Sequence, residues 1–235
     1  MLRPRLAKTE PMPEQLTFDL PVRASLERGD FFVSDANALA VSRLEDVSTW
    51  TSGKMVLVGP KGAGKSHLGH VWADAQDGTL VELGTLEASG VVQHAAPLAV
   101  EIPEAPSATE EQVLFHLHNH MASSQHLLLL IARLPPSRWP LNLPDLKSRM
   151  EATEVVQIEP PDDALLAAVL VKLFADRQLH VAPSLIEWLT KRMDRSFAEA
   201  QRLVAAIDAA ALAEGRAVSR TLAQRILDNA PNSAR

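Results

Sequence analysis

Short apolar runs alternate with longer mixed segments between about residues 31 and 158, a pattern typical of a parallel β-sheet wrapped by helices. The chain is therefore expected to have an α/β core. The apolar runs predict strands over residues 55–58, 80–83, 98–100, 127–131 and 155–158. The segments between them predict helices over residues 37–44, 67–75 and 110–121, and a helical turn over 143–150.

The pattern changes after the double proline at residues 160–161, beyond which only helices are predicted. A helix over 162–178 opens with Asp162, Ser219 is expected to cap a last helix, and two Ser-x-x-Glu sequences, at Ser184 and Ser196, match the capping box. These features divide the chain into four predicted parts. Residues 1–24 are a tail with a short extended peptide, and residues 25–159 are an α/β core. Residues 160–228 are a small all-α lid subdomain, and residues 229–235 are a final tail.

A phosphate-binding loop carries the clearest chemistry. Residues 59–66 read Gly-Pro-Lys-Gly-Ala-Gly-Lys-Ser, a full G-x-x-x-x-G-K-[ST] match between the first predicted strand and a predicted helix. Its glycines let successive backbone N–H groups point into one cavity, and the helix N-terminus favours anions. Lys65 is expected to reach the β- and γ-phosphates, and the Ser66 hydroxyl to ligate Mg²⁺. The sequence therefore predicts a nucleotide-binding protein.

Composition narrows the class of protein. The chain has 235 residues, 46% of them hydrophobic, and a net charge of −6, which argues against binding nucleic acid over its whole surface. It has no cysteine and no apolar run long enough to span a bilayer, so we expect a cytoplasmic protein without membrane association.

One segment of the N-terminal tail has a regular pattern. Leu16, Phe18 and Leu20 alternate strictly after Gln15, in a stretch otherwise rich in proline and charge. Periodicity alone leaves two interpretations open: a peptide that docks in a partner's groove, or an edge strand of the protein's own sheet.

A P-loop core followed by a helical lid is the outline of an AAA+ module, and further segments resemble the DnaA/Hda branch of that class. Residues 30–40 resemble the branch's segment that wraps the adenine, and residues 139–149 resemble its arginine-finger region, L-P-D-L-x-S-R. The Gln15–Leu20 peptide is similar to the sliding-clamp peptide of the Hda family. The chain is also expected to lack the initiator's helix-turn-helix domain.

The resemblance implies a set of functional residues. Arg149 would be an arginine finger that acts in trans, Glu101 would hold Mg²⁺ together with Ser66, and the clamp would bind Gln15, Leu16, Phe18 and Leu20. ADP or ATP would be held by Phe32, Val33, Asn37, Pro60, Lys61, Gly62, Ala63, Gly64, Lys65, Ser66, His67 and Arg195.

Three positions depart from the usual AAA+ pattern. Ile102 stands where a second acid would orient water, although Glu104 follows nearby. The sensor position after the fourth strand falls on Ile131 or Ala132, and the lid arginine falls on Ala198, one turn after Arg195. A misalignment by one or two residues remains an alternative for the strand ends. Together the departures predict weak intrinsic ATP hydrolysis at most.

The preserved Arg149 favours a protein that assists another ATPase, since arginine fingers complete a neighbour's site. A structural alternative is that Arg149 caps the preceding turn or pairs with Glu151. The lid arginines Arg192, Arg195 and Arg202 form a basic stripe, either a solvated face, part of the nucleotide site or a contact with DNA.

The resemblance thus implies a regulator of replication initiation that binds the β sliding clamp and stimulates ATP hydrolysis by DnaA. Its contact with DNA would be indirect, through the clamp, and it could form homo-oligomers. The alternatives are a self-hydrolysing AAA+ ATPase such as a helicase loader, or a DnaA-like initiator paralogue.

Overall fold

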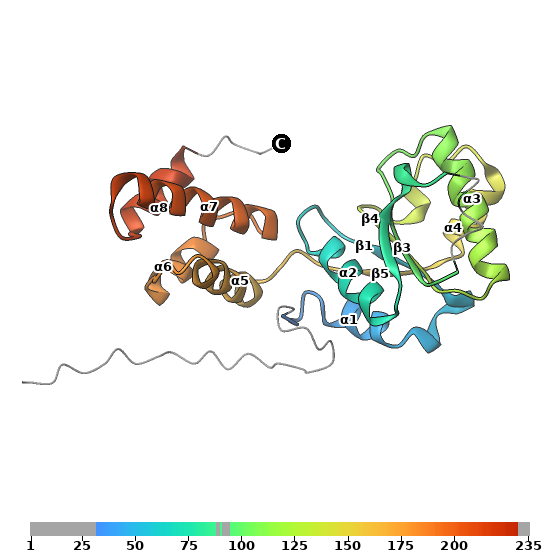
Figure 1. The fold of residues 1–235 in the computed structure, drawn as a ribbon, viewed down its shortest axis with the longest axis horizontal. Coiled ribbons are helices and arrows are strands. Elements are labelled where there is room, and N and C mark those ends of the chain that lie inside the picture. Colours follow the sequence, from blue (N-terminus) through green and yellow to red (C-terminus); the bar gives the residue numbers. More distant parts are fainter. Residues whose placement is uncertain (1–31, 88–89, 91–94, 230–235) are drawn as a thin grey trace, which may run out of the picture.

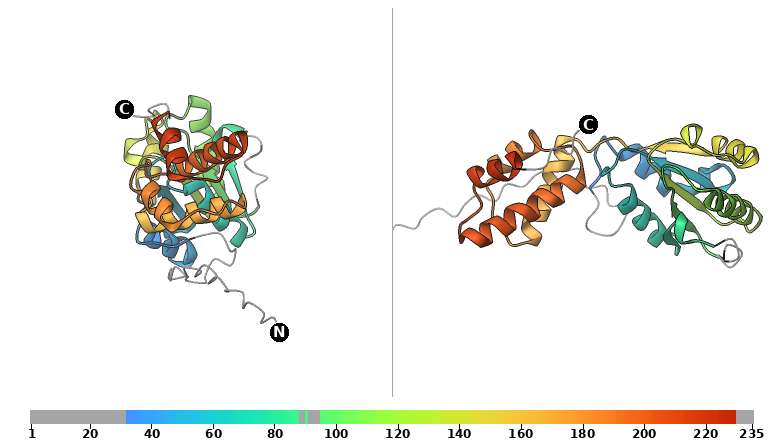
Figure 2. Two further views of the ribbon diagram at one scale, coloured as in Figure 1. Left: turned by 90° about the vertical axis from the view of Figure 1, so that its left-hand side faces the viewer. Right: turned by 90° about the horizontal axis from the view of Figure 1, so that it is seen from above.

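The protein consists of an α/β lobe and a helical lobe joined by one extended connection. We describe it from a computed structural model, which covers residues 32–87, 90 and 95–229. Figure 1 shows the α/β lobe on one side and the last four helices on the other, and Figure 2 shows the same elongated outline from above.

The α/β lobe is built on a five-stranded, fully parallel sheet of order β2-β3-β4-β1-β5. Both faces of β1 and β4 are buried, which explains why these strands are continuous apolar runs in the sequence. The strands are β1 (Lys54–Val58), β2 (Thr79–Glu82), β3 (Leu98–Glu101), β4 (Leu128–Ala132) and β5 (Glu154–Gln157). All five predicted strands are confirmed, with ends shifted by a residue or two.

Helices cover both faces of the sheet and bury alternate strand residues. On one face, Val56 and Leu130 pack with side chains of α3 and α4, and on the other, Leu57 and Leu129 pack with side chains of α1 and α2. The helices are α1 (Ala38–Glu45), α2 (Lys65–Ala75), α3 (Ala108–Ser123) and α4 (Pro144–Glu151). Short 3₁₀ turns span Val47–Thr49, Thr51–Gly53, Leu83–Thr85 and Pro136–Arg138.

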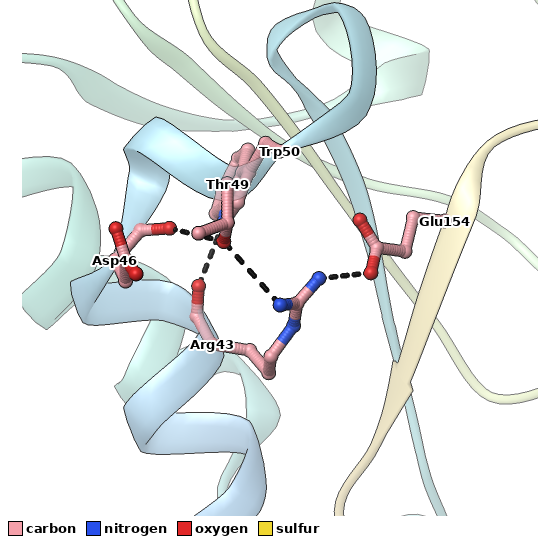
Figure 3. Close-up of polar contacts among 5 residues, drawn as sticks. All are labelled: Arg43, Asp46, Thr49, Trp50 and Glu154. Carbon is pink, nitrogen blue, oxygen red and sulfur yellow. Dashed lines mark hydrogen bonds and ion pairs between the residues drawn. The ribbon is translucent and has the colours of Figure 1, made fainter.

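Polar contacts fix α1 beside the edge strand β5, as Figure 3 shows. Arg43 of α1 forms an ion pair with Glu154 and donates to the Thr49 hydroxyl at 3.3 Å. The indole N–H of Trp50 donates to the Arg43 carbonyl at 2.7 Å. These contacts attach the last turn of α1, and the 3₁₀ turn that follows it, to the start of β5.

The helical lobe follows Pro160 and Pro161 and has a core of its own. That core includes Phe174 on α5, Trp188 on α6, Ile207 on α7 and Leu222 on α8. Its helices are α5 (Asp163–Asp176), α6 (Pro183–Thr190), α7 (Phe197–Glu214) and α8 (Arg220–Asp228).

The expected helix caps are partly confirmed. The side chains of Ser196 and Ser219 each accept a backbone N–H at their helix starts, at 3.1 and 3.3 Å. The predicted capping box at Ser184 is wrong, because α6 begins at Pro183 and its N-cap is Ala182, two positions before Ser184. Proline is favoured at the first helical position, where its missing N–H costs no hydrogen bond.

Candidate functional site

The loop between β1 and α2 has the backbone that a phosphate-binding loop requires. Gly62 and Gly64 have positive φ values of 76° and 89°, which side chains other than glycine rarely adopt. At Gly59, an added Cβ would lie 2.5 Å from the Ile158 carbonyl oxygen, so the close approach of the two chains requires glycine. The predicted strand–loop–helix arrangement is therefore confirmed.

Lys65 begins α2, and its side chain turns back across the loop. Its ammonium donates to the Pro60 carbonyl at 2.7 Å. Burial lowers the pKa of Lys65 from its usual value, the charge of Arg133 lowers this pKa further, and the charge of Glu101 opposes both. An anion entering the loop would offset the cost of burying this ammonium.

A cavity of about 410 Å³ opens beside this loop, between the two lobes. Most of the predicted nucleotide-binding residues line it: Phe32, Asn37, Gly62, Ala63, Gly64, Lys65, Ser66 and His67. Four other predicted residues do not line this cavity: Val33, Pro60, Lys61 and Arg195. Val33 instead packs against the core on the α1–α2 face.

Asn37 lines the cavity but has a structural task of its own. Its side chain is 3% exposed, accepts the Ser34 N–H at 2.8 Å and donates to the Phe32 carbonyl at 2.9 Å. The Ala36 carbonyl also accepts the N–H of Glu159 at 2.9 Å. These bonds shape the segment before α1 so that Phe32 borders the cavity.

Half of the cavity lining comes from the lid helices α5 and α7, which the sequence interpretation did not assign. The residues that were missed are Leu165, Val169, Lys172, Leu173, Asp176, Phe197, Ala198 and Gln201. Those of α5 recur every three or four residues, a helical stripe that could have indicated one shared face. Leu165, Val169 and Leu173 of this stripe give the cavity an apolar surface suited to a flat ring.

The start of α7 docks directly on the phosphate-binding loop. The N–H of Phe197 donates to the Gly62 carbonyl at 2.8 Å, and its ring lies 2.7 Å from the position of a Cβ at Gly64. Ser196 makes a similar close approach to Gly62. Ala198 borders the cavity, while Arg195 forms an ion pair with Asp163 at 2.7 Å. The lid therefore reaches the loop through backbone and an aromatic ring, without an arginine.

The residues at and after the end of β3 differ in the groups that they offer to the nucleotide site. Glu101 ends β3, two strands from the phosphate-binding loop, and its charge acts on Lys65. Ile102 is 7% exposed and packs in the core, and Glu104 forms an ion pair with Arg133. Ile102 therefore offers no carboxylate, and the carboxylate of Glu104 is shared with Arg133.

Arg133 is a functional candidate that the sequence interpretation missed. It directly follows Ala132, which pairs in register with Val58, the last residue before the phosphate-binding loop. The expected sensor positions Ile131 and Ala132 are both buried and apolar. A signal was present in the sequence, because Arg133 is the first polar residue after the strand.

Ser66 and Glu101 remain a suitable pair for Mg²⁺. Ser66 lines the cavity at the start of α2, and Glu101 is partly buried on a nearby strand end. The described residues contain no group of three or more His, Cys, Asp or Glu side chains that could hold a metal ion. This donor set fits Mg²⁺, which commonly binds through one or two protein oxygens together with nucleotide phosphates.

Arg149 lies near the end of the sheet where the strands begin, opposite the end that carries the phosphate-binding loop. It precedes β5 by five residues, and its charge lowers the pKa values of Lys54, at the start of β1, and of His118. The phosphate-binding loop follows the other end of β1, a span of roughly 16 Å for its five residues. Arg149 therefore cannot serve the nucleotide site of its own chain.

The surroundings of Arg149 leave it accessible. Its side chain is 42% exposed, and its contact with Asp145 is long at 3.4 Å. Its guanidinium carbon lies 5.7 Å from the centre of the Phe115 ring. The ion pair is thus with Asp145, on the preceding turn of α4, in place of the expected alternative Glu151.

Comparison with known structures defines the class of fold. Domain III of the Thermotoga maritima replication initiation protein DnaA superposes with a TM-score of 0.69 at 14% identity, covering 85% of this chain and 94% of that one. A FIGL-1 AAA domain in complex with ADP gives 0.65 at 12% identity, over 85% and 81%. A replication initiator DnaA bound to AMPPCP and single-stranded DNA gives 0.61 at 17%, over 84% and 70%. The chain therefore has the AAA+ fold, an α/β core followed by a helical lid.

More narrowly, it shares the fold of domain III of DnaA. No model of a known protein family matches the sequence. Among the described residues, no helix is long and apolar enough to cross a membrane. The clamp-peptide prediction falls on Gln15, Leu16, Phe18 and Leu20, which lie outside the described residues.

Proposed function

We propose that this protein is an adenine-nucleotide-binding regulator of chromosomal replication initiation, which binds the sliding clamp and stimulates ATP hydrolysis by DnaA. It would act in the cytoplasm, where the chromosome lies, and would reach DNA through the clamp. The observation that carries this proposal is the accessible Arg149, at the end of the strands opposite its own phosphate-binding loop.

Nucleotide binding is supported by the cavity and its chemistry. The phosphates would lie in the loop that ends with Lys65 and Ser66, and the base would lie against Phe32 and the apolar stripe of α5. Similar structures are described as bound to AMPPCP or ADP, which supports ATP or ADP as the ligand. Mg²⁺, held by Ser66 and Glu101, would neutralise phosphate charge.

A role in trans is supported by the contrast between the two ends of the strands. After β3, Ile102 is buried and Glu104 is paired with Arg133, so we expect the chain's own site to orient water poorly. At the end where the strands begin, the Arg149 guanidinium is 42% exposed and could reach a neighbour. An arginine finger stabilises the transition-state charge on a phosphate that another subunit holds.

Clamp binding would use the tail. In the proposed organisation, residues 1–24 carry the docking peptide, residues 25–159 form the nucleotide-binding core, 160–228 the lid and 229–235 a second tail. The alternating Leu16, Phe18 and Leu20 would fill an apolar groove of the clamp's β subunit. Docking through a tail would leave the surface around Arg149 able to contact DnaA. The same surface could join copies of this chain.

The test is a turnover measurement on a partner. DnaA loaded with ATP is incubated with this protein, with DNA-loaded clamp, with both, and with neither, and conversion of its ATP to ADP is followed. The proposal expects fast conversion only when both are present. A further arm contains this protein and ATP without DnaA or clamp, and fast conversion there would instead favour the alternative, a self-hydrolysing AAA+ ATPase such as a helicase loader.

A further inference from the structure

Two arginines of the lid cover one tryptophan. The guanidinium carbon of Arg192, after α6, lies 4.7 Å from the centre of the Trp188 ring, and that of Arg220, at the start of α8, lies 5.1 Å from it. Trp188 is only 6% exposed, and its buried indole N–H has no hydrogen-bond partner in the described part of the chain. The ring thus forms a rigid base for two cations that are themselves exposed.

These two arginines differ from Arg195 and Arg202, two other arginines of the lid. Arg195 forms an ion pair with Asp163 at 2.7 Å, and Arg202 with Glu199 at 2.6 Å. Within the described residues, neither Arg192 nor Arg220 forms an ion pair with a carboxylate. The basic stripe expected from the sequence therefore splits into neutralised members and one cationic pair, which joins residues 28 positions apart in the chain.

The surface beside this pair is polar. Arg220 borders an open hollow of about 590 Å³ on α8, whose lining also comprises Thr221, Gln224, Arg225, Asp228 and Asn229. The one carboxylate there, Asp228, accepts the Gln224 amide at 2.7 Å, and Arg225 is paired with Glu214. Hydroxyl and amide groups of this kind commonly donate to phosphates and sugars.

We infer that Arg192 and Arg220 form a binding site for the backbone phosphates of DNA, separate from the nucleotide cavity. A guanidinium stacked on a ring can present its in-plane N–H groups to a phosphate in a bidentate fashion. Arg192 uses one N–H in a long contact with the Trp188 carbonyl, at 3.5 Å, and its remaining N–H groups can face a phosphate. Because the helix ends and the indole hold both forks, little side-chain freedom is lost on binding. A net charge of −6 leaves such binding to local cationic sites.

The choice of DNA as the occupant rests on the proposed function, which brings the lid near DNA at a loaded clamp. The phosphate chemistry itself does not depend on it. The test therefore uses the full chain and labelled single-stranded and duplex oligonucleotides alone, with neither clamp nor DnaA present. A failure here leaves the regulatory proposal intact, and a failure of that proposal leaves this binding measurable.

The experiment compares two double variants with equal loss of charge. Arg192→Gln/Arg220→Gln removes the proposed phosphate-binding arginines. Arg177→Gln/Arg202→Gln removes two lid arginines that are paired with Asp208 and Glu199. Affinity for the oligonucleotides is measured by fluorescence anisotropy over a series of salt concentrations. Thermal unfolding checks that each variant is folded.

Arg192→Gln/Arg220→Gln should lower the affinity for the oligonucleotides on the order of tenfold. It should also reduce the slope of log affinity against log salt concentration by about two, roughly one per phosphate contact. The matched variant should change both much less. Arg192→Lys/Arg220→Lys, which preserves the charge, should keep most of the slope while losing affinity, because an ammonium lacks the planar fork. Equal losses in the two glutamine variants, or no salt-dependent binding by the wild type, would overturn the inference.

Discussion

His118 illustrates how burial sets the ionisation of a single residue. Its side chain is 8% exposed on α3, and its Nδ1 has no partner among the described residues. Burial, with smaller contributions from the charges of Lys54 and Arg149, lowers the pKa of His118 from 6.5 to about 4. The folded protein therefore holds this histidine neutral throughout the physiological range.

The pH dependence of stability should follow from this shift. As pH falls from about 6.5 towards 4, the unfolded chain binds a proton at His118 before the folded chain does, so the free energy of unfolding should decrease. His118→Gln should flatten this decrease, measured by urea unfolding at several pH values. His70→Gln, at an exposed position, serves as the control. An unchanged slope for His118→Gln would contradict the assignment.

Intrinsic turnover should be slow, because Ile102 is buried and Glu104 is paired with Arg133. The purified protein is expected to bind ATP yet hydrolyse it more slowly than about one per second, since positioning water is a catalytic and not a binding role. Glu104→Gln should leave the steady-state rate unchanged. A large fall in rate in that variant would identify Glu104 as the base.

For single residues, the sequence predicted those features that depend only on neighbouring positions in the chain. The apolar character of Ile102, Ile131 and Ala198 was evident from their places relative to the strands and helices. The pairing of Glu104 with Arg133 was not, because the two residues are 29 positions apart and meet only through the order of strands in the sheet. The stacking of Arg220 on Trp188 was also hidden, because it brings together residues of α8 and α6 that are far apart in the chain.

Among the elements, α7 links the lid to the nucleotide cavity. Phe197→Ala should remove the ring that packs on Gly64 while keeping the backbone bond to Gly62. We expect a loss on the order of 1 kcal/mol in ATP affinity, about fivefold, for a half-buried ring. Calorimetric titration with ATP and ADP measures it. Leu212→Ala, an exposed site on the same helix, is the control, and equal affinities in the two variants would exclude Phe197 from binding.

Periodicity predicted the strands and most helices, because burial on one or both faces leaves a direct record in the sequence. It did not reveal which lid residues line the cavity, since that depends on how the lid packs against the core. The site itself was predicted where it is a continuous motif, from Gly62 to His67. It was missed where helices α5 and α7 complete it.

For the molecule as a whole, the tail and the core should act as separable units. Gln15→Ala combined with Leu16→Ala should abolish clamp binding while leaving the thermal midpoint of unfolding nearly unchanged. The physical reason is that these residues lie in a segment without a predicted core of its own. Pull-down and calorimetry with the clamp measure the effect, and wild-type affinity in the double variant would rule the peptide out.

The central claim is that Arg149 completes the active site of another ATPase. The most direct measurement is the rate at which DnaA converts its bound ATP, in the presence of DNA-loaded clamp and either wild-type protein or Arg149→Ala. The rate stimulated by the variant should fall steeply, since arginine fingers contribute on the order of 10³–10⁵. Arg149→Lys should fail almost as badly, because it lacks the planar fork.

Lys147→Ala removes a positive charge from the same helix and should retain stimulation, and nucleotide and clamp binding should be normal in every variant. If Arg149→Ala stimulates DnaA as well as the wild type does, the trans role is wrong. Arg149 would then serve only its contacts with Asp145 and Phe115.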